Sequence, residues 1–361
     1  MAAISYPSRQ QKAATDMLIS LSLPARQEAI DATLLPDIIE LYISTKARDG
    51  AITPKTEHNY RNQLNPWFAF WTECPDIHHG QLSPAILRNA LDWMRTDYRT
   101  RLDRPPAANS VAHCWTRLKQ VFLWAFTANC TGTVNLVDWC PQVEHVEPNV
   151  HFPDLHEMTL LFAQPSGETR LRDIAAMAYM LSTGARRFEV AQARAELTTF
   201  VTPVTNLDVS ANHAGWTHLQ RVKGDAEGHG AGRVVCFDTV CGLLLKCYLR
   251  SVNRVTGPLF GMSDTGIGQM IDRHAHAAGV GEVSPHGFRR MLSDYWDEVH
   301  GMNGRYALKK QLGHNLDGGD VTERHYISRN PRRVARELAK WHVSPLRELA
   351  WNWTDFPVHL P

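Results

Sequence analysis

The sequence lacks the features that mark membrane and exported proteins. No apolar run approaches the roughly 20 residues that a helix needs to span a bilayer. The opening stretch, MAAISYPSRQQKAATDML, lacks the basic and then apolar pattern of a signal peptide. We therefore expect a cytoplasmic protein with no membrane partner.

Paired cysteines are also absent. The seven cysteines are scattered and none form a CxxC pair, which argues against a zinc site or a disulfide framework. We expect buried, reduced thiols. The 18 histidines raise the possibility of a metal site, for instance Cys74 with His78 and His79. No further ligand pair has a recognisable spacing, so we expect no metal and no other cofactor.

The chain has little excess charge of either sign. A formal net charge of +1 neither requires nor excludes a nucleic-acid partner, because the distribution of charge matters more than its sum. Basic residues concentrate between His286 and Lys340. A solvated helical face would explain some of them, but a surface facing phosphates explains the clustering better. The basic residues in this segment include Arg289, Arg290, Arg305, Lys309, Lys310, Arg324, Arg329, Arg332, Arg333 and Arg336.

A chain of 361 residues suggests two domains, and its first third reads as helical. Amphipathic stretches carry apolar residues at helical spacing, and Thr53 and Ser83 are each followed by a proline, as at a helix start. We interpret the aromatic stripes as core. The pattern predicts an N-terminal extension over 1–33 and a helical domain over 34–145.

Prolines at Pro141, Pro148 and Pro153 mark a connector, so the domain boundary is expected near 140–155. The segment 152–345 begins with helices, continues with three short strand patterns between Gly- and Asn-containing turns, and returns to helix. Residues 346–361 form a C-terminal tail. The expected fold class is mainly α with a small antiparallel β-sheet.

Several short motifs in the second domain carry chemically useful residues, though each is weak alone. In TGARRFE, Arg186 precedes Glu189 by one helical turn, which could also be a surface ion pair. In SPHGFRR, His286 and Arg289 share one face near a helix N-terminus, where anions are favoured. Lys223 lies where a strand meets a glycine-rich hairpin turn, and it could equally be an ordinary exposed lysine.

The order of these motifs is more specific than any one of them. From N- to C-terminus the chain presents RxxE, a hairpin lysine, HxxR, LGH and then a tyrosine. In this order the sequence resembles the tyrosine recombinase (phage-integrase-like) family over roughly residues 34 to 340. The resemblance implies a helical core-binding domain, a mixed α+β catalytic domain, and a C-clamp around duplex DNA.

The resemblance implies a site-specific recombinase that cuts and rejoins DNA through a 3′-phosphotyrosine, without metal or ATP. It also implies a tetramer on two double-stranded DNA recombination sites. The C-terminal helix would dock on a neighbouring protomer, or else pack on its own domain. Glu189 would support the first arginine. The implied catalytic residues are Arg186, Lys223, His286, Arg289, His314 and Tyr326.

Three features depart from the family pattern. Arg290 follows Arg289 where many members have histidine, and Arg187 could compete with Arg186 for the first role, although the RxxE register favours Arg186. Tyr326 follows His314 by 12 positions (326 − 314), which the glycine-containing insert DGGD at 317–320 accounts for. Two alternatives remain: a type IB topoisomerase, which relaxes DNA without strand exchange, and a DNA-binding protein that has lost catalysis.

Overall fold

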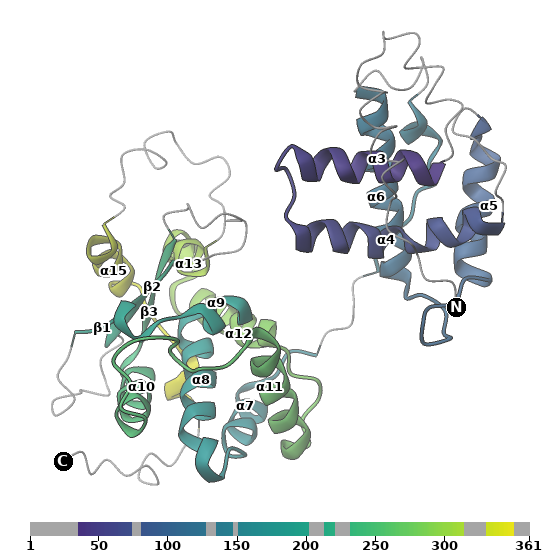
Figure 1. The fold of residues 1–361 in the computed structure, drawn as a ribbon. Helices are drawn as coiled ribbons and strands as arrows, with labels where there is room; N and C mark the ends of the chain where they lie inside the picture. Colours follow the sequence, from purple (N-terminus) through teal and green to yellow (C-terminus); the bar gives the residue numbers. More distant parts are fainter. Residues whose placement is uncertain are drawn as a thin grey trace. The chain divides into compact units, whose positions relative to one another are not determined.

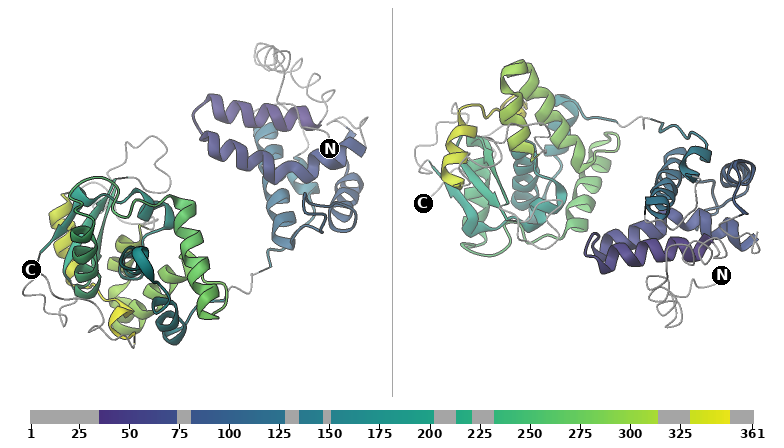
Figure 2. Two further views of the ribbon diagram at one scale, coloured as in Figure 1. Left: turned by 60° about the horizontal axis from the view of Figure 1, so that its bottom comes forward. Right: turned by 90° about the horizontal axis from the view of Figure 1, so that it is seen from above.

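The chain forms two compact units, residues 1–148 and 149–361, drawn in Figure 1 and from two further sides in Figure 2. The computed structural model describes residues 35–73, 81–127, 135–146, 151–201, 213–220, 232–313 and 330–349. Within these ranges no helix is both long enough and apolar enough to cross a membrane. The Cys74, His78 and His79 group lies outside the described residues, and no cluster of three or more metal-ligating side chains occurs among the described ones.

The described part of the first unit is helical. Thr53 accepts a hydrogen bond from the Thr56 N–H at 3.2 Å, and Ser83 accepts one from the Ile86 N–H at 3.3 Å, so both act as the predicted helix caps. The elements are α3 (Leu35–Arg48), α4 (Pro54–Glu73), α5 (Pro84–Thr96), α6 (Ala108–Thr127) and the 3-10 helix η2 (Leu136–Trp139).

Aromatic side chains form the core of this unit. Trp67 on α4 is fully buried, and its ring centroid lies 4.9 Å from that of Trp115 on α6 and 6.1 Å from that of Trp71. Edge-to-face and stacked ring pairs of this kind add to the stabilisation that burial provides. The interpretation of the aromatic stripes as core is therefore correct for these residues.

The second unit surrounds one helix with the others. Every side chain from Asp173 to Thr183 of α8 (Arg170–Thr183) is buried, which is expected of a helix enclosed on all sides. Its neighbours include α10, α12 and the strand β3. The other described helices are α7 (Leu155–Phe162), α9 (Arg187–Gln192), α10 (Thr239–Ser251), α11 (Asp264–Ala278), α12 (Pro285–His300), α13 (Arg305–Leu312) and α15 (Pro331–Ala339), with 3-10 turns η3 (Gly167–Thr169), η4 (Ala195–Leu197), η6 (Gly301–Gly304) and η7 (Pro345–Arg347).

A small antiparallel sheet completes the unit, in the order β1 (Thr198–Phe200), β2 (Gly215–Leu219) and β3 (Arg233–Phe237). The pairing places Leu219 opposite Arg233, so Arg233 lies at the end of β3 nearest the hairpin turn. A mostly helical chain with this sheet confirms the predicted fold class.

The amphipathic segment after Asn330 packs on its own unit. Ala335 and Leu338 of α15 are buried in a cluster with Val234 and Cys236 of β3. The Cys236 thiol approaches the Ala335 carbonyl at 3.5 Å. Of the two arrangements expected for this helix, the described one is packing against its own domain.

The five described cysteines are free thiols, and four of them are buried.

Two leucines on α6 allow a matched test of the first unit's core. Leu118 is fully buried, whereas Leu123 is 48% exposed. Because Leu118→Ala leaves a cavity, we expect it to lower the free energy of unfolding by about 2–5 kcal/mol. Leu123→Ala should change it by about 0.5 kcal/mol or less. Denaturant unfolding of the full chain, with hydrogen exchange of α6 peptides, measures both, and equal losses would contradict the assigned core.

Candidate active site

A glycine corner joins α8 to α9 and begins the candidate site. Gly184 ends α8 with φ of +62°, a backbone region that only glycine adopts readily. A Cβ atom at this position would lie 2.5 Å from Leu312 Cδ2 and 3.0 Å from Leu292 Cδ2. The corner therefore needs glycine for its backbone conformation and for space, and it brings the TGARRFE motif against the end of α13.

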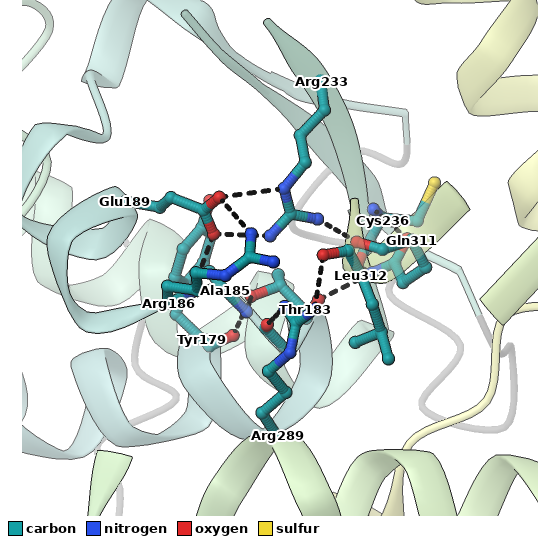
Figure 3. A network of polar contacts seen from close by, with 11 residues as sticks. Tyr179, Thr183, Ala185, Arg186, Glu189, Arg233, Cys236, Arg289, Gln311 and Leu312 are labelled. Carbon is teal, nitrogen blue, oxygen red and sulfur yellow. Dashed lines mark hydrogen bonds and ion pairs between the residues drawn. The ribbon is translucent and has the colours of Figure 1, made fainter. Parts of the chain in front are cut away.

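Glu189 lies one turn into α9 with its side chain fully buried. Its Oε2 accepts a hydrogen bond from the Arg186 backbone N–H at 2.7 Å, and its Oε1 accepts one from Arg186 Nη1 at 3.0 Å. The RxxE pair therefore joins a fully buried carboxylate to a guanidinium that is 29% exposed, and it is not the surface ion pair that the motif alone would also allow. Figure 3 shows this contact at the centre of a larger polar network.

A second guanidinium binds the same carboxylate. Arg233 donates from Nε to Glu189 Oε1 at 3.2 Å and from Nη2 to Oε2 at 2.6 Å, while its Nη1 donates to the Gln311 carbonyl. Its side chain is only 8% exposed. Arg233 is not among the site residues predicted from the sequence. The available signal was weak: it is the single charged residue of the otherwise apolar strand RVVCF.

These two arginines control the ionisation of Glu189. Burial by itself would raise the pKa of the carboxyl group, because it disfavours the charged form. The charges of Arg233 and Arg186, with the hydrogen bonds they donate, outweigh burial and hold the pKa of Glu189 below its ordinary value. Glu189 is therefore a carboxylate at neutral pH.

Arg289 reaches the site from α12, on the side of the network away from Arg233 (Figure 3). Arg289 is only 4% exposed. It donates from Nη1 to the Gly184 carbonyl at 2.7 Å and from Nη2 to the Leu312 carbonyl at 2.6 Å. Burial and then the positive charges of Arg186 and Arg233 lower the pKa of Arg289 to about 9, which Glu189 offsets only in part.

Gln311 fixes the end of α13 to the rest of the site. Its amide is fully buried and donates to the carbonyls of Thr183 at 3.1 Å and Cys236 at 2.8 Å, and it accepts from the Cys236 N–H at 3.0 Å. A buried amide that satisfies its donors and acceptor in this way specifies one arrangement of the three segments. The described range 232–313 ends at Gly313, one residue before His314.

The structure brings together three of the predicted site residues: Arg186, Glu189 and Arg289. His286 lies on the first turn of the same helix as Arg289 with its side chain exposed, and it makes no hydrogen bond or ion pair to another described residue. The helix start predicted at SPHGFRR is capped by Ser284. The other predicted residues, Lys223, His314 and Tyr326, lie outside the described ranges.

The neighbouring arginines are engaged elsewhere. Arg187 pairs with Asp264 of α11, with Nε 2.7 Å from Oδ1 and Nη2 3.2 Å from Oδ2. Arg290, which stands where the family pattern has histidine, pairs with Asp294 at 2.9 Å on the surface of α12. Of the two adjacent arginines in TGARRFE, only Arg186 contacts Glu189.

Counted by side chains, the cluster holds more positive than negative charge. Three guanidiniums face one carboxylate, so 3 − 1 leaves an excess of two positive charges. Like charges at close range disfavour each other's charged forms, and an added anion relieves that repulsion. Guanidinium groups bind phosphate and carboxylate through paired N–H donors. The arrangement is therefore suited to a multiply negative or phosphate-like ligand.

Comparison with solved structures identifies the fold. A lambda integrase dimer bound to a COC′ core site matches with a TM-score of 0.56 and 14% identity over 82% of this chain and 96% of that one. A lambda integrase tetramer bound to a Holliday junction matches with a TM-score of 0.58 and 14% identity over 87% and 90% of the two chains. The Tn1549 transposon integrase in complex with transposon right end DNA matches with a TM-score of 0.53 and 15% identity over 84% of this chain and 98% of that one.

These structures are tyrosine recombinases, and at this level of identity the likeness shows the fold. The chain therefore has the tyrosine-recombinase fold, as the resemblance in its motifs predicted. No protein-family model matches the chain, and no curated protein does.

The buried carboxylate allows a sharp test of the cluster. Glu189→Gln leaves two guanidiniums without their counter-ion, so we expect the free energy of unfolding at neutral pH to fall by about 3–5 kcal/mol. Asp264→Asn is the matched control. It removes a carboxylate that is 31% exposed and paired with Arg187, and it should cost about 1 kcal/mol or less.

The lowered pKa of Glu189 also predicts how the stability of the protein depends on pH. Because the pKa of Glu189 is lowered in the folded state, its contribution is complete above the unfolded pKa of about 4.3 and is lost as pH falls through the lower folded value. The stability difference between wild type and Glu189→Gln should therefore shrink in acid. Denaturant unfolding at a series of pH values measures this difference, and a gap that persists unchanged at low pH would contradict the assignment.

Proposed function

We propose that the protein is a site-specific DNA recombinase or integrase that cuts and rejoins DNA strands through a 3′-phosphotyrosine formed by Tyr326. The observation that carries the proposal is the cluster of Arg186, Arg233 and Arg289 around a single buried carboxylate, on the tyrosine-recombinase fold. The ligand that this cluster suits is the phosphodiester of double-stranded DNA.

In the proposed reaction, Arg186 and Arg289 hold the nonbridging oxygens of the scissile phosphate. Attack on phosphorus builds negative charge on these oxygens, and fixed donors stabilise it without reorganising. Arg289 uses one N–H of each terminal nitrogen on the carbonyls of Gly184 and Leu312, and each nitrogen carries a second N–H. The two carbonyls thus orient the guanidinium while leaving it donors for phosphate. Two arginines can supply this stabilisation with no metal ion.

The nucleophile and the proton transfers are assigned to the residues that match the family motifs. The phenol of Tyr326 has an ordinary pKa of about 10 and must lose its proton, which His286 accepts as general base. The tyrosine oxygen bonds to phosphorus, the bond to the 5′ oxygen breaks, and Lys223 protonates the leaving oxygen. His314 donates a hydrogen bond to the phosphate. Attack by a 5′ hydroxyl then reverses these steps, so rejoining needs no ATP.

We further propose that the protein acts as a tetramer on two recombination sites, with its two units closing around duplex DNA. The lambda integrase tetramer bound to a Holliday junction, which shares this fold, supports that assembly. The four described α-helices of the first unit, α3 to α6, would serve as the core-binding domain.

The first experiment separates Tyr326 from another tyrosine. Tyr326→Phe removes the phenolic oxygen, so it should abolish covalent protein–DNA adducts on a nicked suicide substrate while leaving DNA affinity nearly unchanged, because binding rests on phosphate contacts elsewhere. Tyr306→Phe, at a 37% exposed tyrosine of α13, is the control and should form adducts at the wild-type rate. Both are assayed in excess EDTA. Adducts trapped by the Tyr326→Phe variant would remove Tyr326 from the mechanism.

The second experiment separates Lys223 from the arginines. If Lys223 protonates the leaving group, Lys223→Ala should slow cleavage of normal DNA by about 10²–10⁴-fold. The cleavage rate of this variant should recover on a bridging 5′-phosphorothiolate substrate, because the departing thiolate needs little protonation. Arg289→Ala should be defective on both substrates, because charge on the nonbridging oxygens develops in either case. If Lys223→Ala is equally defective on both substrates, Lys223 is a phosphate contact and not the acid.

A further inference from the structure

Arg233 is the residue of the cluster to which neither the motifs nor the proposed reaction gives a role. We propose that Arg233 is a positioning residue that couples the arginine corner at Gly184–Arg186 to the end of α13, from which the chain runs on to His314. The inference rests on the proposed function, and it assigns to Arg233 no contact with DNA.

The contacts of Arg233 reach both sides of the site. Two of its nitrogens bind Glu189, which in turn holds both the backbone and the side chain of Arg186. The third nitrogen donates to the Gln311 carbonyl on α13. A displacement of Arg233 therefore removes support from α9 and from α13 at once, although these elements lie far apart in the sequence.

The end of α13 is built to receive this arginine. Gly313 ends the helix with φ of +63°, and a Cβ atom there would lie 2.5 Å from Arg233 Cδ and 2.9 Å from its Nε. Any larger residue would displace the guanidinium. The last carbonyls of a helix lack partners within the helix and carry the negative end of its dipole, so a cation is favoured beside them.

Two consecutive carbonyls at this helix end accept hydrogen bonds from two different arginines. The Gln311 carbonyl accepts from Arg233, and the Leu312 carbonyl accepts from Arg289 at 2.6 Å. The position of Arg289 is thus tied to that of Arg233 through two adjacent residues of the backbone. Arg233 sets the spacing of the two arginines proposed to hold phosphate.

The engagement of Arg233 argues for positioning and against a direct catalytic role. All three of its nitrogens, Nε included, donate to protein oxygens, whereas Arg289 donates to described residues from its two terminal nitrogens only. Lysine cannot reproduce this pattern, because an ammonium is a point charge without the planar fork that spans two acceptors. Arg233→Lys therefore keeps the charge of the cluster and removes only the geometry.

The test uses the full chain with single-turnover cleavage of the suicide substrate, at a temperature well below the melting point of every variant. Misplacing catalytic groups by about 1 Å can cost on the order of 10²-fold in rate. We therefore expect Arg233→Lys and Arg233→Met to slow cleavage by about 10- to 100-fold. Their affinity for DNA, and the dependence of that affinity on salt, should remain within about twofold of wild type, because Arg233 makes no phosphate contact.

The control is Arg254→Met. Arg254 is also partly buried and also donates to main-chain carbonyls, those of Pro258 at 2.9 Å and Leu259 at 3.1 Å, but it lies outside the cluster. This variant should lose stability and keep the wild-type cleavage rate. In a double-mutant cycle with Glu189→Gln, the rate effects of Arg233→Lys should be strongly non-additive, because both changes break one network.

The outcomes separate this inference from the proposed function. If the wild-type protein forms no adduct, the proposed function fails. If wild type cleaves and Arg233→Lys cleaves at the same rate, the positioning role fails and the proposed function stands. A slower rate accompanied by an equal loss of DNA affinity would make Arg233 a DNA contact and overturn the inference, as would an equal slowing in Arg254→Met.

Discussion

The candidate site depends on one buried carboxylate. Glu189 accepts hydrogen bonds from the backbone of Arg186 and from the guanidiniums of Arg186 and Arg233. These groups lower the pKa of Glu189 and so keep its carboxyl group ionised. Without a negative charge at this position, the arginines would repel one another without compensation, and Arg186 would lose the acceptor for its backbone and its side chain. Because a buried ion pair recovers its desolvation cost only with good geometry and further hydrogen bonds, the site must be assembled precisely or not at all.

Assembly before ligand binding has an electrostatic consequence. One carboxylate cannot neutralise three guanidiniums, and the pKa of Arg289 is lowered first by burial and then by the remaining repulsion from Arg186 and Arg233. The folded protein therefore holds donors in place against their mutual repulsion, and a bound phosphate anion would relieve it. Preorganised donors of this kind are effective in catalysis because they need not reorient as charge develops in the transition state.

The sequence predicted those parts of the site that are local in the chain. Arg186 and Glu189 are one turn apart, and a polar pair at that spacing can be read directly from TGARRFE. The helix starts at Thr53, Ser83 and Ser284 were also predictable, because a cap acts on residues two or three positions away. The small antiparallel sheet was predicted from alternating apolar segments.

Arg233 could not be predicted in the same way. Its partners Glu189 and Gln311 lie 44 and 78 positions away, and only the folded unit brings them together. The same holds for the carbonyls that Arg289 contacts, which belong to two other segments. The order of family motifs indicated which residues gather, but not which main-chain oxygens and which additional arginine hold them.

The contact between Gly184 and Leu312 links two positions that are 128 residues apart (312 − 184). A smaller side chain at 312 would make space for a Cβ atom at 184, yet it would not remove the penalty for a positive φ there. The two positions therefore carry unequal evolutionary freedom. A smaller residue at 312 costs packing in its own buried cluster, whereas a change at 184 also needs space beside Leu312 and Leu292 and still retains its backbone strain. Among related sequences, substitution at 312 should therefore precede any substitution at 184.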